Sequence, residues 1–181
     1  GFFVTGGLLI TTYLVPMMTD VTHIPLEQTP WYLLLLGFGG FVGNVIGGRL
    51  ADWKLMPSML AIFCGGALLH LALTLTSTSA ILIGINLFVL GAVAFSFGGH
   101  VHPRLLSGAT AAPHLASTLN NTAFNIGIAS GAGVGGALIN AGFAYNQLPL
   151  FAFAFDIAGA SVVLLSMLLD RRAPAAASEP A

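Results

Sequence analysis

The chain has 181 residues, of which 56% are hydrophobic and 6% are charged, and its formal net charge at pH 7 is -1. A mean hydropathy of +0.93 leaves too little polar surface to cover a water-soluble globule of this size. The composition therefore indicates an integral membrane protein, and five Lys and Arg residues spread along the chain exclude the basic face that a nucleic-acid partner requires.

Six apolar stretches are long enough to cross a bilayer, for which a helix needs about 20 mostly apolar residues. They are residues 2–19, 31–51, 57–76, 79–101, 116–140 and 147–169. Short polar or proline-bearing segments separate them, so the sequence predicts an all-α integral membrane bundle over residues 1–170, with the lipid bilayer as its surroundings. Residues 171–181 have no periodic apolar face and predict a disordered cytoplasmic tail.

The basic residues fall on alternate connections between these spans. Arg49 and Lys54 flank the second connection, Arg104 lies in the fourth, and Arg171 and Arg172 follow the last span. The positive-inside rule then predicts a multi-pass protein of the cell (inner) membrane with both termini in the cytoplasm. The chain starts GFFVTGG, without Met or a basic segment, so we expect no signal peptide and a start inside a longer protein.

Glycines recur every four residues in two of the spans. They are Gly39, Gly43 and Gly47 in the second span, and Gly127, Gly131 and Gly135 in the fifth. This spacing puts each trio on one helical stripe, where two backbones can approach closely, so ordinary tight packing is one interpretation. The other is an internal repeat, because the second and fifth spans hold equivalent places in two three-helix units. Since three is odd, the second unit enters from the opposite side, which predicts an inverted 3+3 repeat.

A charged motif follows the first glycine stripe. GGRLADWKLMP, residues 47–57, resembles the cytoplasmic loop signature Gly-x-Leu-Ala-Asp-Arg-x-Gly-Arg of the major facilitator superfamily. Gly48, Leu50, Ala51 and Asp52 match it, whereas Trp53 stands where Arg is usual and Leu55 where the second Gly is usual. Residues 117–145 resemble the eleventh helix of bacterial drug or sugar efflux proton antiporters in this family.

The resemblance implies the carboxy-terminal six-helix half of a twelve-helix transporter. It also implies proton-coupled efflux of a small molecule by alternating access, with an amino-terminal six-helix half as partner and no cofactor. In the loop motif, Arg49 and Lys54 can bind lipid phosphate, and Asp52 can pair with either or face the positive end of a helix. The resemblance implies that Asp52 latches one half to the other, and the alternative is a topology anchor without a switching role.

Polar side chains inside the spans are candidates for a substrate cavity. Ser117, Asn121 and Asn125 repeat every four residues on the side of the fifth span opposite its glycines. Such a stripe predicts a water-filled cavity, although Asn can also hydrogen-bond a neighbouring helix. The weaker candidates are Thr5, Thr12, Asn44 and Asn86.

Asp156 is the only acid inside a span, near the middle of the sixth, and His70 lies at a similar depth in the third. An ionised carboxylate at this depth costs at least about 2.5 kcal/mol, so Asp156 needs a partner or a proton. Three alternatives stay open: a direct contact with His70, a solvated or protonated carboxyl, and a role in transport.

Two other protein classes are rivals to a transporter. Ser130 is the only hint of an intramembrane serine protease. Its histidine base would have to come from a later helix, and no histidine follows His114. A six-span scaffold that transports nothing is also compatible with the sequence. His100, His102 and His114 lack the carboxylate or thiolate of a good ligand set, so we predict no metal site.

Overall fold

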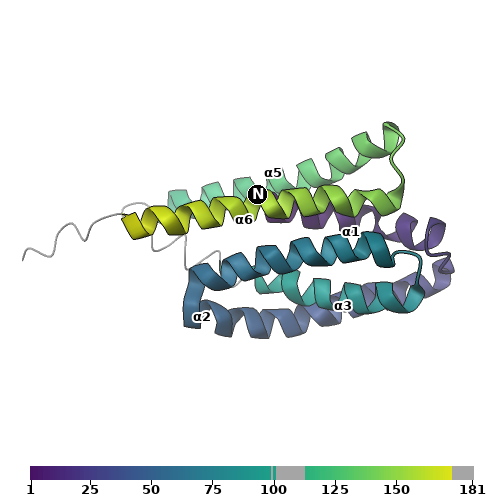
Figure 1. The fold of residues 1–181 in the computed structure, drawn as a ribbon, viewed down its shortest axis with the longest axis horizontal. Coiled ribbons are helices and arrows are strands. Elements are labelled where there is room, and N and C mark those ends of the chain that lie inside the picture. Colours follow the sequence, from purple (N-terminus) through teal and green to yellow (C-terminus); the bar gives the residue numbers. More distant parts are fainter. Residues whose placement is uncertain (99, 101–112, 173–181) are drawn as a thin grey trace, which may run out of the picture.

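The computed structural model describes residues 1–98, 100 and 113–172, and this part of the chain is helical with no strand. Its elements are α1 (Phe2–Asp20), η1 (Leu26–Gln28), α2 (Thr29–Thr76), α3 (Ala80–Ser96), α5 (Pro113–Asn140), η2 (Tyr145–Gln147) and α6 (Leu148–Arg172). Figure 1 shows the helices lying side by side along the long axis of the molecule.

The helices have the length and composition of membrane spans. α1, α2, α5 and α6 are long and apolar enough to cross a bilayer, and α3 is a shorter apolar helix of 17 residues. Large apolar side chains such as Trp31, Phe41 and Ile81 are exposed, so the surface needs lipid or another protein segment to cover it. The described part of the chain is therefore an all-α membrane protein, as the sequence predicts.

α2 has 48 residues, about 72 Å of helix, which is more than twice the roughly 30 Å of the hydrocarbon core. Lys54 interrupts it with φ -152° and ψ 91°, and Figure 1 shows the helix folding back there into two legs. Pro57 favours a break at this place because its ring has no N–H to bond the Trp53 carbonyl and clashes with that carbonyl. The first leg is residues 29–53 and the second is residues 55–76.

The helices pack in two groups that meet at α6. α2 packs on α3 and α6, while α1 packs on α5 and α6. One apolar cluster includes Leu9, Leu73 and Leu148, and a second includes Phe3, Phe63 and Phe97. The three rings of the second cluster lie with centroids 4.5–5.6 Å apart. Each cluster joins α1, α2 and α6, so together they bind the two groups into one bundle.

The segments that connect the helices lie at the two ends of the bundle. Those around η1, between α2 and α3, and around η2 share one end, and the Lys54 kink and the end of α6 lie at the other (Figure 1). At the first end the Thr22 hydroxyl donates to the Ser77 carbonyl at 2.6 Å, which joins two connections.

Several helix boundaries differ from the sequence predictions. The second and third spans, predicted to be separated by the loop DWKLM, are the two legs of α2 with a kink at Lys54 between them. α3 ends at Ser96, before the predicted limit at residue 101, although residues 98 and 100 are also helical. α6 continues to Arg172 and so includes the first two residues of the predicted tail, and residues 173–181 lie outside the described residues.

Candidate functional site

The glycines of the first leg of α2 form a backbone-to-backbone crossing with α3. A methyl group built on Gly39 would overlap the Phe88 carbonyl oxygen, and one on Gly43 would overlap that of Ala92. The crossing is reinforced by the Ser96 hydroxyl, which lies 2.8 Å from the Gly43 carbonyl oxygen. Only glycine permits this approach, as expected where two helices in a membrane pack by van der Waals contact.

The glycines of α5 form a second crossing, with α1. A Cβ on Gly131 would lie 2.5 Å from the Thr5 carbonyl oxygen, and one on Gly127 would lie 3.0 Å from that of Gly1. Gly135 faces the Tyr13 ring, whose hydroxyl donates to the Ala132 carbonyl at 3.0 Å. Both glycine stripes thus bury their helix against a single neighbour.

The polar stripe of α5 lies away from this crossing. Ser117, Asn121 and Asn125 are exposed, whereas Gly127 and Gly131 are buried. Within the described part of the chain, neither asparagine amide makes a hydrogen bond. A membrane-length helix therefore presents unpaired amides on its open face.

The four weaker candidates differ in their surroundings. Thr12 and Asn44 are exposed. Thr5 is buried at the α1–α5 crossing, and its hydroxyl donates to the Gly1 carbonyl. Asn86 is buried on α3, and its amide donates to the Leu69 carbonyl of α2 at 3.0 Å, which is the interhelical bond that the sequence left as an alternative.

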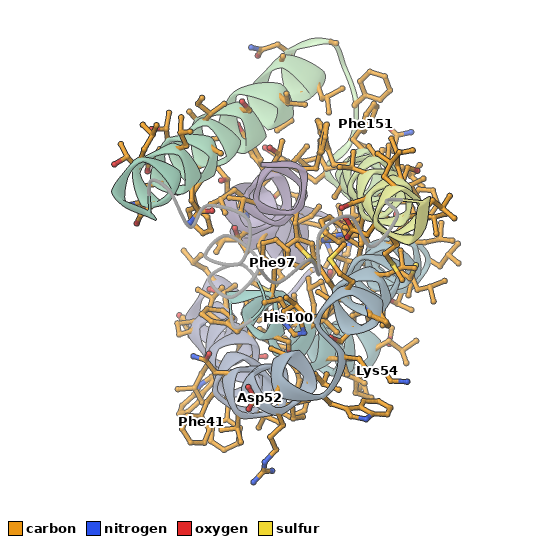
Figure 2. The ribbon with its side chains drawn as sticks, turned by 90° about the vertical axis from the view of Figure 1, so that its left-hand side faces the viewer. Phe41, Asp52, Lys54, Phe97, His100 and Phe151 are labelled. Carbon is orange, nitrogen blue, oxygen red and sulfur yellow. The ribbon has the colours of Figure 1, made fainter. Side chains whose placement is uncertain are left out.

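The loop motif lies at the kink of α2. Gly48, Arg49 and Asp52 are exposed, and no ion pair joins Asp52 to Arg49 or Lys54 within the described residues. The Lys54 ammonium lies 5.3 Å from the centre of the Trp53 ring, within the range of a cation–π contact. Figure 2 shows Asp52 and Lys54 at the rim of the bundle, where both charges are accessible to lipid or to another segment.

The side chains of Ser58 and His100 form a buried polar contact beside the kink, which the sequence did not predict. His100 Nδ1 lies 2.9 Å from the Ser96 carbonyl oxygen, and its Nε2 lies 2.8 Å from the Ser58 hydroxyl. A carbonyl only accepts, so Nδ1 donates to Ser96, and the Ser58 hydroxyl bonds the other ring nitrogen, Nε2. The Ser58 oxygen also lies within 3.2 Å of the carbonyls of Leu50, Lys54 and Leu55. Ser58 and His100 therefore tie both legs of α2 to the helical turn that follows α3.

The side chain of His100 is enclosed by protein groups. His100 is completely buried and bonded to Ser58, as Figure 2 shows it inside the bundle near Phe97, so its two nitrogens are committed to protein groups. His102 and the His114 side chain lie outside the described residues, as does Arg104.

His70 and Asp156 are brought together from the second leg of α2 and from α6. His70 Nδ1 lies 2.8 Å from Asp156 Oδ2, and both residues are buried. The other nitrogen of the ring, Nε2, and the other carboxyl oxygen, Oδ1, are buried without a hydrogen-bond partner. The sequence indicated both residues from depth alone, but not how the pair is enclosed.

Two hollows open between α2 and α3, one at each end of the bundle. One of about 770 Å³ is lined by residues that include Gln28, Trp31 and Phe88, and one of about 530 Å³ by residues that include Lys54, Ser58 and Ser96. None of the predicted cavity residues lines either hollow. A cavity bordered by Asn121 and Asn125 would need a further protein segment opposite α5.

The chain is similar to several curated bacterial transport proteins. It is 31% identical over 164 residues to the inner membrane transport protein YdhP of Escherichia coli K12, covering 90% of this chain and 42% of that protein. It is 31% identical over 122 residues to a chloramphenicol resistance protein of Streptomyces lividans, covering 66% and 31% of the two chains. It is 27% identical over 177 residues to a probable sugar efflux transporter of Haemophilus influenzae strain 86-028NP, covering 93% and 43%.

No family model matches the chain. The apolar helical bundle and these relatives nevertheless define a class, that of multi-span membrane transport proteins. Within this class the chain belongs to the major facilitator superfamily. It spans less than half the length of the curated relatives described above.

Proposed function

We propose that this chain is the carboxy-terminal six-helix half of a secondary transporter that exports a small molecule in exchange for protons. The amino-terminal half would supply the other six helices, and the substrate would bind between the halves near the bilayer midplane. Relatives named for sugar efflux and for chloramphenicol resistance support export of small molecules as the function. Neither a cofactor nor a nucleic-acid partner enters this proposal.

The two glycine crossings support the inverted repeat. If the legs of α2 count as the second and third spans, one crossing joins the second span to the fourth and the other joins the fifth to the first. If spans one to three are exchanged with spans four to six in the same order, the crossing of spans two and four becomes the crossing of spans five and one. The His70–Asp156 contact joins the third span to the sixth and is converted into itself.

The charge distribution supports an inner membrane orientation with the kink end in the cytoplasm. Arg49 and Lys54 lie near the kink, and Arg171 and Arg172 end α6 at the same end of the bundle. In this orientation Asp52 is an exposed cytoplasmic acid, free to contact the amino-terminal half. Its role as a latch and the lipid binding of Arg49 and Lys54 are parts of the same proposal.

The observation that carries the proposal is the open polar face of α5. Polar side chains at membrane depth usually face a bundle interior or a pathway, and Asn121 and Asn125 are exposed in this half. Thr12 and Asn44 are exposed on α1 and on the first leg of α2, so they are the other candidates for the cavity wall.

The test expresses the full-length gene in a bacterial strain without its main exporters and measures resistance to a panel that includes chloramphenicol and toxic sugar analogues. For the compound exported, Asn125→Ala should reduce resistance about 5-fold, the effect of losing one hydrogen bond of about 1 kcal/mol. Asn140→Ala, the same change at the end of α5, is the matched control. If expression of the unmodified gene changes resistance to none of the compounds, the result would favour a scaffold and contradict the proposal.

A further inference from the structure

The His70–Asp156 pair lies where three helices meet. Asp156 of α6 contacts His70 on the second leg of α2, and Gly6 of α1 lies alongside the carboxyl group. On α2, His70 lies between Phe63 of one apolar cluster and Leu73 of the other. Gly6 on α1 and Asp156 on α6 also lie between residues of the two clusters. Two ionisable groups are therefore enclosed between apolar layers at mid-membrane depth.

The hydrogen bonding of the pair is incomplete. The 2.8 Å contact uses His70 Nδ1 and Asp156 Oδ2, and it leaves Nε2 and Oδ1 buried without partners. A buried polar atom without a partner costs free energy, and a pair retained only for stability would be expected to satisfy its atoms. Replacing such a pair by apolar residues often leaves stability unchanged or increases it, so stability alone does not account for it.

The charge of the pair changes with one proton. A neutral imidazole beside an ionised carboxylate carries a net charge of -1, which an apolar environment strongly disfavours. One added proton gives a neutral pair, either as imidazolium and carboxylate or as imidazole and carboxylic acid. In both forms the added proton is bound to the imidazole or to the carboxyl group, and no other group is protonated.

No other charged group of the described chain compensates the pair. The remaining described charged residues of α1, α2, α3 and α6 lie at helix ends or near the kink, and they are Asp20, Arg49, Asp52, Lys54, Asp170, Arg171 and Arg172. Lys54 and Asp170 are 16 and 14 residues along the helix from the pair, about 24 and 21 Å. The other titratable side chains of the same elements are Tyr13, bonded to Ala132, half-buried Tyr32, and the exposed Cys64.

We propose that His70 and Asp156 form a proton-binding site that takes up one exchangeable proton and couples its binding to transport. The coupling part rests on the proposed export function, whereas proton binding does not. Because Oδ1 lies beside α1 and Oδ2 beside α2, any shift of these helices relative to α6 changes the surroundings of the carboxyl group. By linkage, protonation then changes the balance between conformations of the helices in return.

Gly66 offers a variant that disturbs the pair while keeping both ionisable groups. A Cβ at Gly66 would lie 2.9 Å from Asp156 Oδ2, the oxygen that bonds His70, so Gly66→Ala must push this oxygen away. Gly65→Ala is the matched control, because a Cβ there would lie 3.8 Å from the nearest atoms, two methyl groups of Val93.

The first experiment counts protons on the purified full-length transporter by potentiometric titration between about pH 5 and 8, where few other side chains change charge. The unmodified protein should bind one proton per molecule more than the His70→Gln, Asp156→Asn double variant. Gly66→Ala should shift the midpoint of this difference and Gly65→Ala should leave it in place. No difference between the unmodified protein and the double variant would overturn the site.

Gly6→Ala replaces Gly66→Ala if the latter does not fold, because its Cβ would lie 3.2 Å from the Ala152 carbonyl oxygen and must move α1 slightly relative to α6 beside Asp156 Oδ1. The midpoint should then shift because the surroundings of this oxygen change. An unshifted midpoint in every folded variant at Gly6 and Gly66 would overturn the link between the helices and the proton.

The second experiment measures proton-driven accumulation of the exported compound in everted vesicles, which corresponds to efflux from the cell, together with its exchange at equal pH. Asp156→Asn should slow proton-driven efflux by about 5- to 150-fold, the usual range of coupling between two ligands, and should preserve exchange. Unchanged efflux would overturn the coupling while the proposed function stands. A proton difference in a protein that exports nothing would support the site and contradict the proposed function.

Discussion

At the scale of single residues, the sequence indicates which groups matter better than it indicates what they do. His70 and Asp156 are predicted from depth because both lie in helices of known rise, so a count along the chain locates them. The sequence assigned no partner to His100, and the structure gives it Ser58 and Ser96 as partners. Those contacts depend on the kink of α2, which brings Ser58 to α3, and no local pattern encodes them.

Ser58→Ala should lower the free energy of unfolding by about 1–3 kcal/mol, because it leaves His100 Nε2 and the carbonyl oxygens at the kink without a hydroxyl partner. Thermal unfolding of the full-length protein in detergent measures the change. The control is Ser161→Ala, whose exposed hydroxyl bonds only the Ile157 carbonyl of its own helix. Equal melting temperatures for the two variants would contradict the role assigned to Ser58.

At the scale of elements, helix packing was the more predictable part. The four-residue spacing of glycines indicates close crossings by itself, and both crossings exist, between α2 and α3 and between α5 and α1. Which helix each stripe meets could not be read from the stripe, because spacing defines a face and not its neighbour. The joining of two predicted spans into α2 was also unforeseen, since the polar motif at Asp52 and Lys54 is typical of a loop, yet only Lys54 leaves the helical conformation.

Gly131→Leu should reduce the amount of folded protein in the membrane, because its side chain would meet the Thr5 carbonyl oxygen and Leu9 backbone of α1. Overpacking at such a contact costs about 1–3 kcal/mol. Gly133→Leu is the matched control on the same helix, as no atom lies within 4 Å of its added Cβ. Size-exclusion chromatography of fluorescently tagged full-length protein compares the two yields. A lower yield for Gly133→Leu than for Gly131→Leu would mean that the packed face of α5 is assigned to the wrong side.

At the scale of the whole molecule, hydropathy predicts the helical membrane class because the bilayer imposes it. Every backbone polar group inside the hydrocarbon must be bonded within the protein, so long apolar segments become helices. The predicted substrate cavity is the part of the molecule that could not be derived from this chain. Asn121 and Asn125 are exposed on this bundle, and the proposed amino-terminal half would supply the wall opposite them. Neutral amides of this kind can hydrogen-bond many different substrates.

The orientation of the bundle leads to the last prediction. Gln28 and Ala141 are exposed at the end of the bundle that holds η1 and η2, and Trp53 is exposed beside the kink at the other end. In a Cys64→Ala background of the full-length protein, cysteines at Gln28 and Ala141 should react in intact cells with an impermeant thiol reagent. A cysteine at Trp53 should react only after the cells are opened, because the positive-inside rule puts Arg49 and Lys54 in the cytoplasm. Mass-tag shifts on a gel measure each reaction, and the opened cells control for a thiol that is merely unreactive. Labelling of the Trp53 site in intact cells, with Gln28 and Ala141 protected, would invert the assigned orientation and place Asp52 outside, where it could not act as a cytoplasmic latch.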